Sequence, residues 1–451
     1  MKFRTSLAVV ALVVTPFSLS LRAQGRGDRW VGTWSTAAVG RPQVPPMPIP
    51  GPPPFMANSC PAPAPVASPP AGQAFAPLPF TQFTNQTLRQ IVHASVGGSK
   101  ARVVVSNVYG TMPLTIGAGH IALRDARGAI KAGSGGPLTF GGRPTVTIPA
   151  NAVVYSDAVT LSVPAMSDLA VDLYLPGTTN VAPPLTMHTA AFQTNYISET
   201  GNHAGSPSMP DVGTMQNWFL LSRVEVAVPE ASGVVVAFGD SITDGTRSTP
   251  DTNSRWPDVF ARRLYAQSPP VRMGVVNAGI AGNRVLGEGA YNAGINALAR
   301  FDLDALDQPG VTHVIVMEGI NDIGTARQNA TPTAEDIIAA HKQLIERAHA
   351  RGVTIIGATL TPFWGAAYYT EEGEKKRQAL NEWIRNGKAY DGVIDFDTAT
   401  RDPGDPKKLN PAFDSCDHLH PNDAGYRAMA ESIDLALFKP AAERPGAGRT
   451  R

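Results

Sequence analysis

The feature that most constrains the fold is a change of sequence pattern near residue 233. Beyond that point, short and almost purely apolar runs alternate with amphipathic stretches. The apolar runs cover residues 234–238, 274–277, 313–317, 353–357 and 393–396, and the amphipathic stretches cover residues 256–267, 334–350 and 372–386. Strands that form continuous apolar runs are buried on both faces, as in a parallel sheet between two helical layers. The pattern therefore predicts an α/β domain over residues 231–438, with its reactive groups at the carboxyl ends of the strands.

The residues before this domain follow a different pattern. Residues 80–230 contain short β-type runs separated by Gly, Pro, Asn and Asp. Residues 169–175 show the two-residue period of a half-buried antiparallel strand. The other runs that we interpret as strands are residues 101–105, 145–148, 153–159 and 219–228. We predict an all-β, sandwich-like domain preceding the α/β domain.

A proline-rich segment lies between the N-terminus and the predicted β domain. Fifteen of the 38 residues from Pro42 to Pro79 are proline. Proline removes a backbone donor and fixes φ, so this part of residues 24–79 cannot form a helix or an inner strand. We predict an extended, polyproline-like insertion over the surface. A flexible linker is the alternative.

Residues 1–23 have the pattern of a secretory signal peptide. Lys2 and Arg4 precede an apolar run over residues 7–19, and Ala23 stands near the expected cleavage site. A membrane anchor is the alternative, but the run is shorter than the roughly 20 apolar residues that cross a bilayer. We expect a secreted or periplasmic protein without a membrane anchor, and residues 439–451 as a C-terminal tail.

Charge and cysteine content narrow the range of partners. The net charge is +1, so no strong field favours nucleic acid. Cys60 and Cys416 are the only cysteines, which excludes a disulfide-rich fold and a Cys-based zinc site. An exported chain with one cysteine pair tends to oxidise it, so we expect a Cys60–Cys416 disulfide. Two unpaired thiols are the alternative.

Polar residues that could take part in catalysis follow the first three predicted parallel strands. Ser241, in Gly239-Asp240-Ser241, stands at a strand-to-helix turn, where nearby backbone N–H groups favour negative charge. A plain helix cap is the alternative. Gly282 follows the second strand and would let a backbone N–H approach an oxyanion, unless it serves only a tight turn. Asn321 follows the third strand and can donate its amide to the same oxyanion, although many loop asparagines only form turns.

A carboxylate and an imidazole follow the last predicted strand. Asp417 and His420 are three residues apart, so one local turn can place the carboxylate at Nδ1 and leave Nε2 facing Ser241. His418 is adjacent to Asp417 and would point elsewhere in most backbone conformations. We therefore interpret His418 as structural.

Four blocks in this order resemble the GDSL or SGNH hydrolase superfamily. They are Gly239-Asp240-Ser241, Gly282, Gly319-Ile320-Asn321-Asp322 and Asp417-His418-Leu419-His420. The resemblance spans about residues 233–438 and implies the three-layer, flavodoxin-like SGNH hydrolase fold. It implies that Ser241 is the nucleophile, His420 the base and Asp417 the residue that orients it. It also implies an oxyanion hole formed by the Ser241 and Gly282 N–H groups and the Asn321 amide.

The resemblance implies a serine esterase that forms an acyl-enzyme and requires no metal or organic cofactor, and the predicted signal peptide implies that it is secreted. The β-rich N-terminal region resembles a subgroup sometimes placed with a xylanase-associated esterase. We expect short acyl groups, such as acetyl, on carbohydrate or related esters to be the substrates, because export and an added β domain suit extracellular polymers. A lipase or arylesterase of the same fold is the alternative.

Three further residues are candidates for substrate binding. Phe363 and Trp364 follow the fourth strand, where aromatic rings can stack on a sugar or line an acyl site. Closing the edge of a core is an equally good interpretation. Arg284 follows Gly282 and can contact substrate, but an ordinary surface ion pair is the simpler assumption.

Two other classes of protein compete with an esterase. A metal-dependent phosphoesterase could use Asp244, Asn283 and histidines as ligands, but His203 precedes the Gly-Asp turn, which is the wrong order for such a site. A non-catalytic glycan-binding protein is the second alternative. A pure binder has no need for a complete Ser, Asp and His set.

Overall fold

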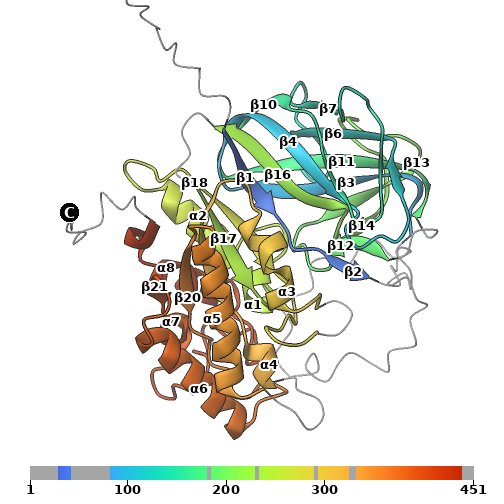
Figure 1. Ribbon diagram of the computed structural model, residues 1–451. Coiled ribbons are helices and arrows are strands. Elements are labelled where there is room, and N and C mark those ends of the chain that lie inside the picture. Colours follow the sequence, from blue (N-terminus) through green and yellow to red (C-terminus); the bar gives the residue numbers. More distant parts are fainter. Residues whose placement is uncertain are drawn as a thin grey trace, which may run out of the picture.

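The computed structural model describes six ranges of the chain, which are residues 29–41, 82–179, 184–228, 233–288, 293–324 and 332–438. The predicted signal peptide, the proline-rich segment with Cys60, and the tail at 439–451 lie outside the described residues. The Cys60–Cys416 disulfide therefore stays a prediction. Figure 1 shows a β-rich half packed against an α/β half.

The α/β half contains a five-stranded parallel sheet in the order β18-β17-β19-β20-β21. The strands are β17 (Gly233–Gly239), β18 (Met273–Gly279), β19 (Val311–Met317), β20 (Thr354–Ala358) and β21 (Gly392–Ile394). The chain passes from β17 to β18 on one side and then crosses to β19 on the other. The strand order thus reverses at β17, where a crevice forms at the carboxyl ends of the strands. The predicted α/β fold is confirmed.

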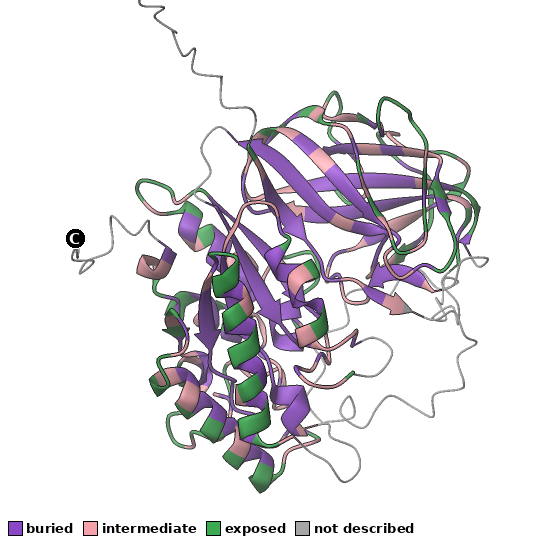
Figure 2. Cartoon of the chain, in the orientation of Figure 1, coloured by how far each residue is buried: buried purple, intermediate pink, exposed green. Residues whose placement is uncertain are grey.

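Helices cover both faces of this sheet. They are α1 (Ser241–Asp244), α2 (Trp256–Tyr265), α3 (Ala297–Phe301), η3 (Asp302–Leu306), α4 (Ile320–Gly324), α5 (Ala334–Ala350), α6 (Glu371–Asn386), α7 (Phe396–Thr400), α8 (Asp423–Ser432) and η4 (Leu435–Phe438). Helix α5 contacts α3 and α6, whereas α8 contacts α2 and α7, as right-handed crossovers on opposite faces require. Figure 2 shows the outer side of α5 exposed and its inner side buried. Within the described ranges, no helix has the length and apolar character needed to cross a bilayer.

The β-rich half is a sandwich, as expected. One sheet has the order β1-β16-β4-β10 with β9 on β4, the other has the order β14-β13-β3-β11-β6-β7, and two small sheets are β15-β12-β2 and β5-β8. The strands are β1 (Arg29–Ser35), β2 (Val39–Arg41), β3 (Thr84–Ala94), β4 (Gly98–Ser106), β5 (Leu114–Ile116), β6 (Ala118–Leu123), β7 (Gly136–Leu138), β8 (Val146–Ile148), β9 (Val153–Tyr155), β10 (Val159–Val163), β11 (Ser167–Thr178), β12 (Leu185–His188), β13 (Asn195–Thr200), β14 (Asp211–Met215), β15 (Trp218–Phe219) and β16 (Leu221–Val228).

Two of the predicted strands are each split in the structure. The run at 153–159 divides into β9 and β10, because Ser156 leaves the ladder and its hydroxyl accepts a hydrogen bond from the Val103 N–H at 2.9 Å. The run at 219–228 divides at Leu220, whose φ of 60° lies in the left-handed region. Apolar periodicity cannot reveal such breaks, since both segments on either side of Leu220 remain buried.

Strand β1 joins the two halves. It pairs with β16, and its Gly32 N–H also donates to the Pro309 carbonyl of the α/β half at 3.1 Å. A side chain at Gly274, on β18, would lie 2.2 Å from the Gly32 carbonyl oxygen, so only glycine permits this approach. The Val275 N–H donates to Ser95 Oγ at 2.9 Å. One hydrophobic core extends through both halves.

Candidate active site

Ser241 stands at the turn that follows the central strand. The residue before it, Asp240, caps α1, because its side chain accepts a hydrogen bond from the Ile242 N–H at 2.9 Å. A side chain at Gly239 would lie 2.6 Å from the Met317 carbonyl oxygen, which explains the glycine at the end of β17. The helix-cap interpretation thus applies to Asp240 and leaves the Ser241 hydroxyl for chemistry.

The structure brings Ser241, His420 and Asp417 together. His420 Nε2 lies 2.8 Å from Ser241 Oγ, and His420 Nδ1 lies 2.8 Å from Asp417 Oδ2. Asp417 Oδ1 also accepts a hydrogen bond from the His420 N–H at 2.8 Å, which closes the local turn expected from the spacing. An imidazole held in this way can take the proton of the serine hydroxyl and activate the oxygen as a nucleophile.

His418 does not join this chain of hydrogen bonds. Its φ of 60° turns the residue away, and its Nδ1 lies 2.5 Å from Asp414 Oδ2. The directional argument from the sequence therefore agrees with the geometry. His418 is 44 % exposed, whereas His420 is 14 % exposed.

Asp417 is held as a carboxylate. Burial raises the pKa of Asp417, but hydrogen bonds from the His420 ring and from the His420 and Leu419 N–H groups outweigh burial and bring the pKa below its usual range. Arg247 Nε lies 3.2 Å from Asp417 Oδ2. A buried carboxylate in this place orients the imidazole and stabilises its protonated form.

The lowered pKa of Asp417 predicts a pH-dependent stability. The contribution of Asp417 to the free energy of unfolding is present above its unfolded pKa of about 3.9 and is lost as the pH falls toward the folded value. In urea denaturation, we expect the destabilisation caused by Asp417→Asn to stay nearly constant down to about pH 5 and then to shrink as the pH falls to about 3. Asp125→Asn, at an exposed position, is the control. A difference that stays constant over this pH range would contradict the prediction.

The loops that carry Gly282 and Asn321 hold each other. Gly282 has a φ of 78°, and Asn321 Nδ2 donates to the Asn283 carbonyl at 3.0 Å. Asp322 accepts hydrogen bonds from the Val285 and Leu286 N–H groups at 2.8 Å and 3.0 Å. Asp322 belongs to the Gly319–Asp322 block, so the sequence already marked it as a residue near the site. Its role in holding the Gly282 loop became visible only in the structure.

A buried arginine beneath the site is a residue that sequence reasoning missed. Arg300 is 1 % exposed, and it donates to the carbonyls of Gly239 and Ala278 at 2.9 Å and 2.8 Å. It also donates to Asn283 Oδ1 at 2.8 Å and to Glu318 Oε1 at 3.1 Å. One cation thus ties together the ends of β17 and β18. Nothing in the sequence around Arg300 distinguishes it from a surface arginine.

Two buried carboxyl groups accompany this arginine. Burial raises the pKa of Asp240 and raises the pKa of Glu318 well above its ordinary value, because a charged carboxylate is poorly solvated there. The charge of Asp322 also raises the pKa of both groups, and the charge of Asp240 raises the pKa of Glu318. The nucleophile turn therefore lies over a buried polar cluster.

The residues proposed for the metal-dependent alternative have protein partners. Asp244 Oδ1 lies 3.0 Å from His188 Nε2, and Asn283 Oδ1 accepts a hydrogen bond from Arg300. Asn283 Nδ2 donates to the carbonyls of Ala293 and Ile295. In the part of the chain that the structure describes, no group of three His, Cys, Asp or Glu residues could hold a metal ion.

The three candidate substrate contacts have different environments. Phe363 is fully buried and its ring lies 5.1 Å from that of Tyr369, so it belongs to the core and the expected substrate contact is wrong. Trp364 is 41 % exposed, with Lys408 Nζ 4.0 Å from its ring centroid. Arg284 is half-buried. Trp364 is therefore the aromatic side chain of this set that a ligand can reach.

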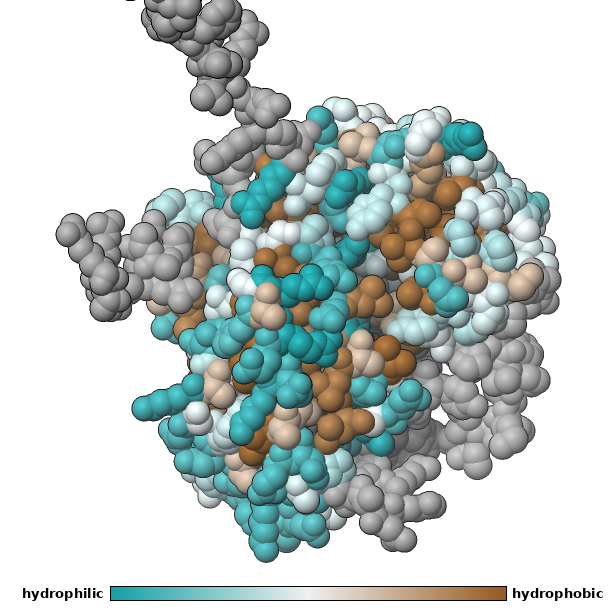
Figure 3. All heavy atoms as spheres, viewed as in Figure 1, coloured by the Kyte–Doolittle hydropathy of each residue, from teal (hydrophilic) through white to brown (hydrophobic). Residues whose placement is uncertain are grey.

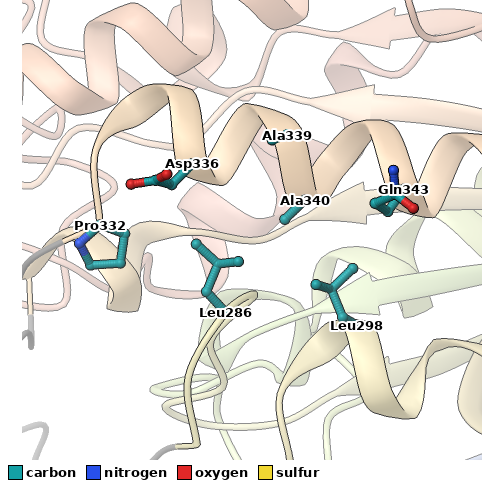
Figure 4. A pocket seen from close by; sticks show the side chains of 7 residues that line it. All are labelled: Leu286, Leu298, Pro332, Asp336, Ala339, Ala340 and Gln343. Carbon is teal, nitrogen blue, oxygen red and sulfur yellow. The ribbon is translucent and has the colours of Figure 1, made fainter.

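An apolar groove of about 530 Å³ lies between α5 and the loop that follows Gly282. Leu286 and Leu298 line one side, and Ala340 and Gln343 line the other, as Figure 4 shows. Figure 3 shows hydrophobic side chains beside the hydrophilic outer surface of α5. The Leu286 N–H donates a hydrogen bond to Asp322, so one wall of the groove is attached to the Gly319–Asp322 block that carries Asn321.

Comparison with known proteins gives one family. Residues 237–428, which include all four blocks, match the model of the GDSL-like lipase/acylhydrolase family. A GDSL-like lipase from Bacteroides thetaiotaomicron VPI-5482 is similar at 22% identity, with 46% of this chain and 88% of that chain covered and a TM-score of 0.33. No curated protein matches the chain.

Two further solved structures are also similar to part of the chain. The aryl esterase of M. smegmatis has 17% identity, with 44% of this chain and 95% of that chain covered and a TM-score of 0.35. A carbohydrate acetylesterase family member from Sinorhizobium meliloti has 16% identity, with 44% of this chain and 94% of that chain covered and a TM-score of 0.36.

Proposed function

We propose that the α/β domain, of which residues 237–428 match the model of the GDSL-like lipase/acylhydrolase family, is a serine esterase of that family with Ser241 as its nucleophile. The observation that carries the assignment is the 2.8 Å distance between His420 Nε2 and Ser241 Oγ, with Asp417 behind the imidazole. A non-catalytic glycan binder has no need for this hydrogen-bonded chain.

The proposed reaction has two steps. Ser241 Oγ attacks the ester carbonyl carbon while His420 Nε2 takes the hydroxyl proton, and the alcohol then leaves with that proton. Water, activated by the same imidazole, cleaves the acyl-enzyme and releases the carboxylic acid. The Ser241 and Gly282 N–H groups and the Asn321 amide donate hydrogen bonds to the developing oxyanion, and one such donor lowers the barrier by about 2.7–4 kcal/mol.

We further propose that the substrates are short acyl esters, such as acetyl groups, on carbohydrate or related alcohols outside the cytoplasm. The half-exposed Trp364 supports this, because an accessible indole face can stack on a sugar ring. The loop of Trp364 lies near the catalytic turn, since a side chain at Gly365 would lie 3.0 Å from the His418 ring. The predicted signal peptide supports export.

A lipase or arylesterase is the second candidate. The apolar groove beside Leu286 favours it, because a volume of about 530 Å³ can take several methylene groups. Each buried methylene contributes about 0.8 kcal/mol, which corresponds to about a fourfold gain in kcat/KM for every carbon added.

A substrate panel separates the two candidates. We expect kcat/KM for p-nitrophenyl esters to be highest for acetate and to fall for chains longer than butyrate, and we expect acetylated xylan to be deacetylated. Trp364→Ala should lower kcat/KM on the xylan and leave p-nitrophenyl acetate unaffected, with the exposed Val393→Ala as the control. A steady gain from acetate to octanoate would instead identify the groove as an acyl site.

A further inference from the structure

The β domain contributes a buried histidine to the region behind the nucleophile turn. His188 ends β12 and is 2 % exposed. Figure 1 shows β12 on the side of the β domain toward α1. The His188 ring stacks on Trp218, with centroids 5.6 Å apart. Trp218 is itself fixed by a hydrogen bond from its indole N–H to the Ile91 carbonyl at 2.9 Å. The core of the β domain therefore holds the His188 ring in one orientation.

Both ring nitrogens of His188 face acceptors. Nδ1 lies 2.7 Å from the Ala37 carbonyl oxygen, and Nε2 lies 3.0 Å from Asp244 Oδ1. A carbonyl and a carboxylate accept hydrogen bonds, so this arrangement requires a proton on each nitrogen. Burial lowers the pKa of His188, but the Asp244 carboxylate and the Ala37 carbonyl raise it overall. Two other charged groups interact with this ring. The charge of Arg255 lowers the pKa of His188, and the charge of His188 lowers the pKa of Asp304.

Asp244 connects this imidazolium to the reaction centre. It is the last residue of the helical turn that starts at Ser241, and it is 1 % exposed. While Oδ1 faces His188, Oδ2 accepts a hydrogen bond from the Ala281 N–H at 3.2 Å. Ala281 directly precedes Gly282, the glycine assigned to the oxyanion hole. A side chain at Gly279 would lie 2.2 Å from the Asp244 backbone nitrogen, so the end of β18 lies directly against the backbone of Asp244.

We propose that His188 is a positioning residue for ester hydrolysis, which holds Asp244 so that its second carboxylate oxygen fixes the Ile280–Ala281 peptide. This peptide directly precedes the one whose N–H, that of Gly282, is assigned to the oxyanion hole. The inference rests on the proposed function. It makes the β domain a working part of the active site, because the imidazolium comes from a strand of that domain and its ring is held by that domain's core.

Two amide substitutions separate the two contacts of the ring. The amide nitrogen of asparagine reaches the position of Nδ1, whereas that of glutamine reaches the position of Nε2. His188→Gln therefore keeps the donor to Asp244, and His188→Asn keeps only the donor to the Ala37 carbonyl. A role limited to joining strands would affect the two variants alike.

The experiment measures kcat and KM for p-nitrophenyl acetate in the full-length protein, per serine labelled by a fluorophosphonate, well below the melting temperature of each variant. We expect His188→Asn to lower kcat about 10- to 100-fold with little change in KM, as a small misplacement of catalytic groups does. His188→Gln should retain kcat within about fivefold of wild type, because the hydrogen bond to the charged Asp244 is kept and a fivefold change is smaller than the loss of such a bond would cause. His120→Asn is the matched control, because His120 packs on Gly205 within the β domain.

Equal kcat values in His188→Asn and His188→Gln, whether near wild type or equally reduced, would overturn the inference alone. If His188→Asn does not fold, Asp244→Asn gives the same test, since its single amide oxygen cannot serve both His188 and Ala281. An unchanged kcat in Asp244→Asn would then overturn the inference. Absence of ester hydrolysis in the wild-type protein would overturn the proposed function and this inference together.

Discussion

Ser241→Ala is expected to lower kcat for p-nitrophenyl acetate by about 10⁴- to 10⁶-fold, because the imidazole then has no hydroxyl to activate. His420 Nε2 lies 2.8 Å from Ser241 Oγ, so this hydroxyl is the group placed to attack the ester. KM should change little, since the Ser241 hydroxyl contributes little to binding of the intact ester. Steady-state hydrolysis at saturating ester gives kcat, and mass spectrometry after fluorophosphonate treatment locates the labelled residue.

Ser248→Ala is the matched control for this substitution. Ser248 is also a buried serine and follows the same helical turn, but it lies outside the hydrogen-bonded chain. Its alanine variant should keep wild-type kcat and label as the wild type does. A Ser241→Ala protein that still turned over more than about a hundredth of the wild-type rate, or that still took up the label, would remove Ser241 from the mechanism.

Arg300→Met is expected to destabilise the fold by about 3–5 kcal/mol, because it removes the cation from a buried polar cluster. The substitution removes the Arg300 hydrogen bonds to the Gly239 and Ala278 carbonyls and to the Glu318 carboxyl, although the Gly239 carbonyl keeps its bond from the Ile280 N–H. Each buried polar group that loses its partner costs about 1–3 kcal/mol. Urea denaturation measures the loss through the midpoint of unfolding.

Arg347→Met is the control for the buried arginine. Arg347 pairs with Asp302 at 2.9 Å, but the two side chains are 31% and 48% exposed. Such a pair contributes at most about 1 kcal/mol. Arg300→Lys, which retains the charge and loses the planar fork, should lie between Arg300→Met and wild type. A loss below about 1 kcal/mol for Arg300→Met would show that the cluster is not what holds the ends of β17 and β18.

Much of the α/β domain could be predicted from local pattern. The expected helix at 334–350 coincides with α5, because its apolar stripe is regular and Thr333 and Asp336 form a capping box at its start. Predicted strands in the sandwich were less accurate. The breaks at Ser156 and Leu220 depend on contacts with β4 and with the Thr186 carbonyl, which belong to distant parts of the chain.

The candidate site divides in the same way. Spacing alone placed Asp417 beside His420, because three residues form one turn. Phe363 shows the limit of the same reasoning, since an aromatic residue after a strand can face the core or solvent, and only packing decides which. Arg300 and His188 carried no local signal, although both hold parts of the site in place through contacts with residues remote in the sequence.

The sequence by itself determined the sheet that brings the blocks to one edge and the residue types that act there, because apolar periodicity and short-range spacing are properties of neighbouring residues. Only the tertiary structure decided how those blocks are held. The hydrogen bonds of Asp244, Asp322 and Arg300 join segments that meet after folding. Their energies come from burial and from the satisfaction of polar groups, and neither quantity exists until the chain has closed around them.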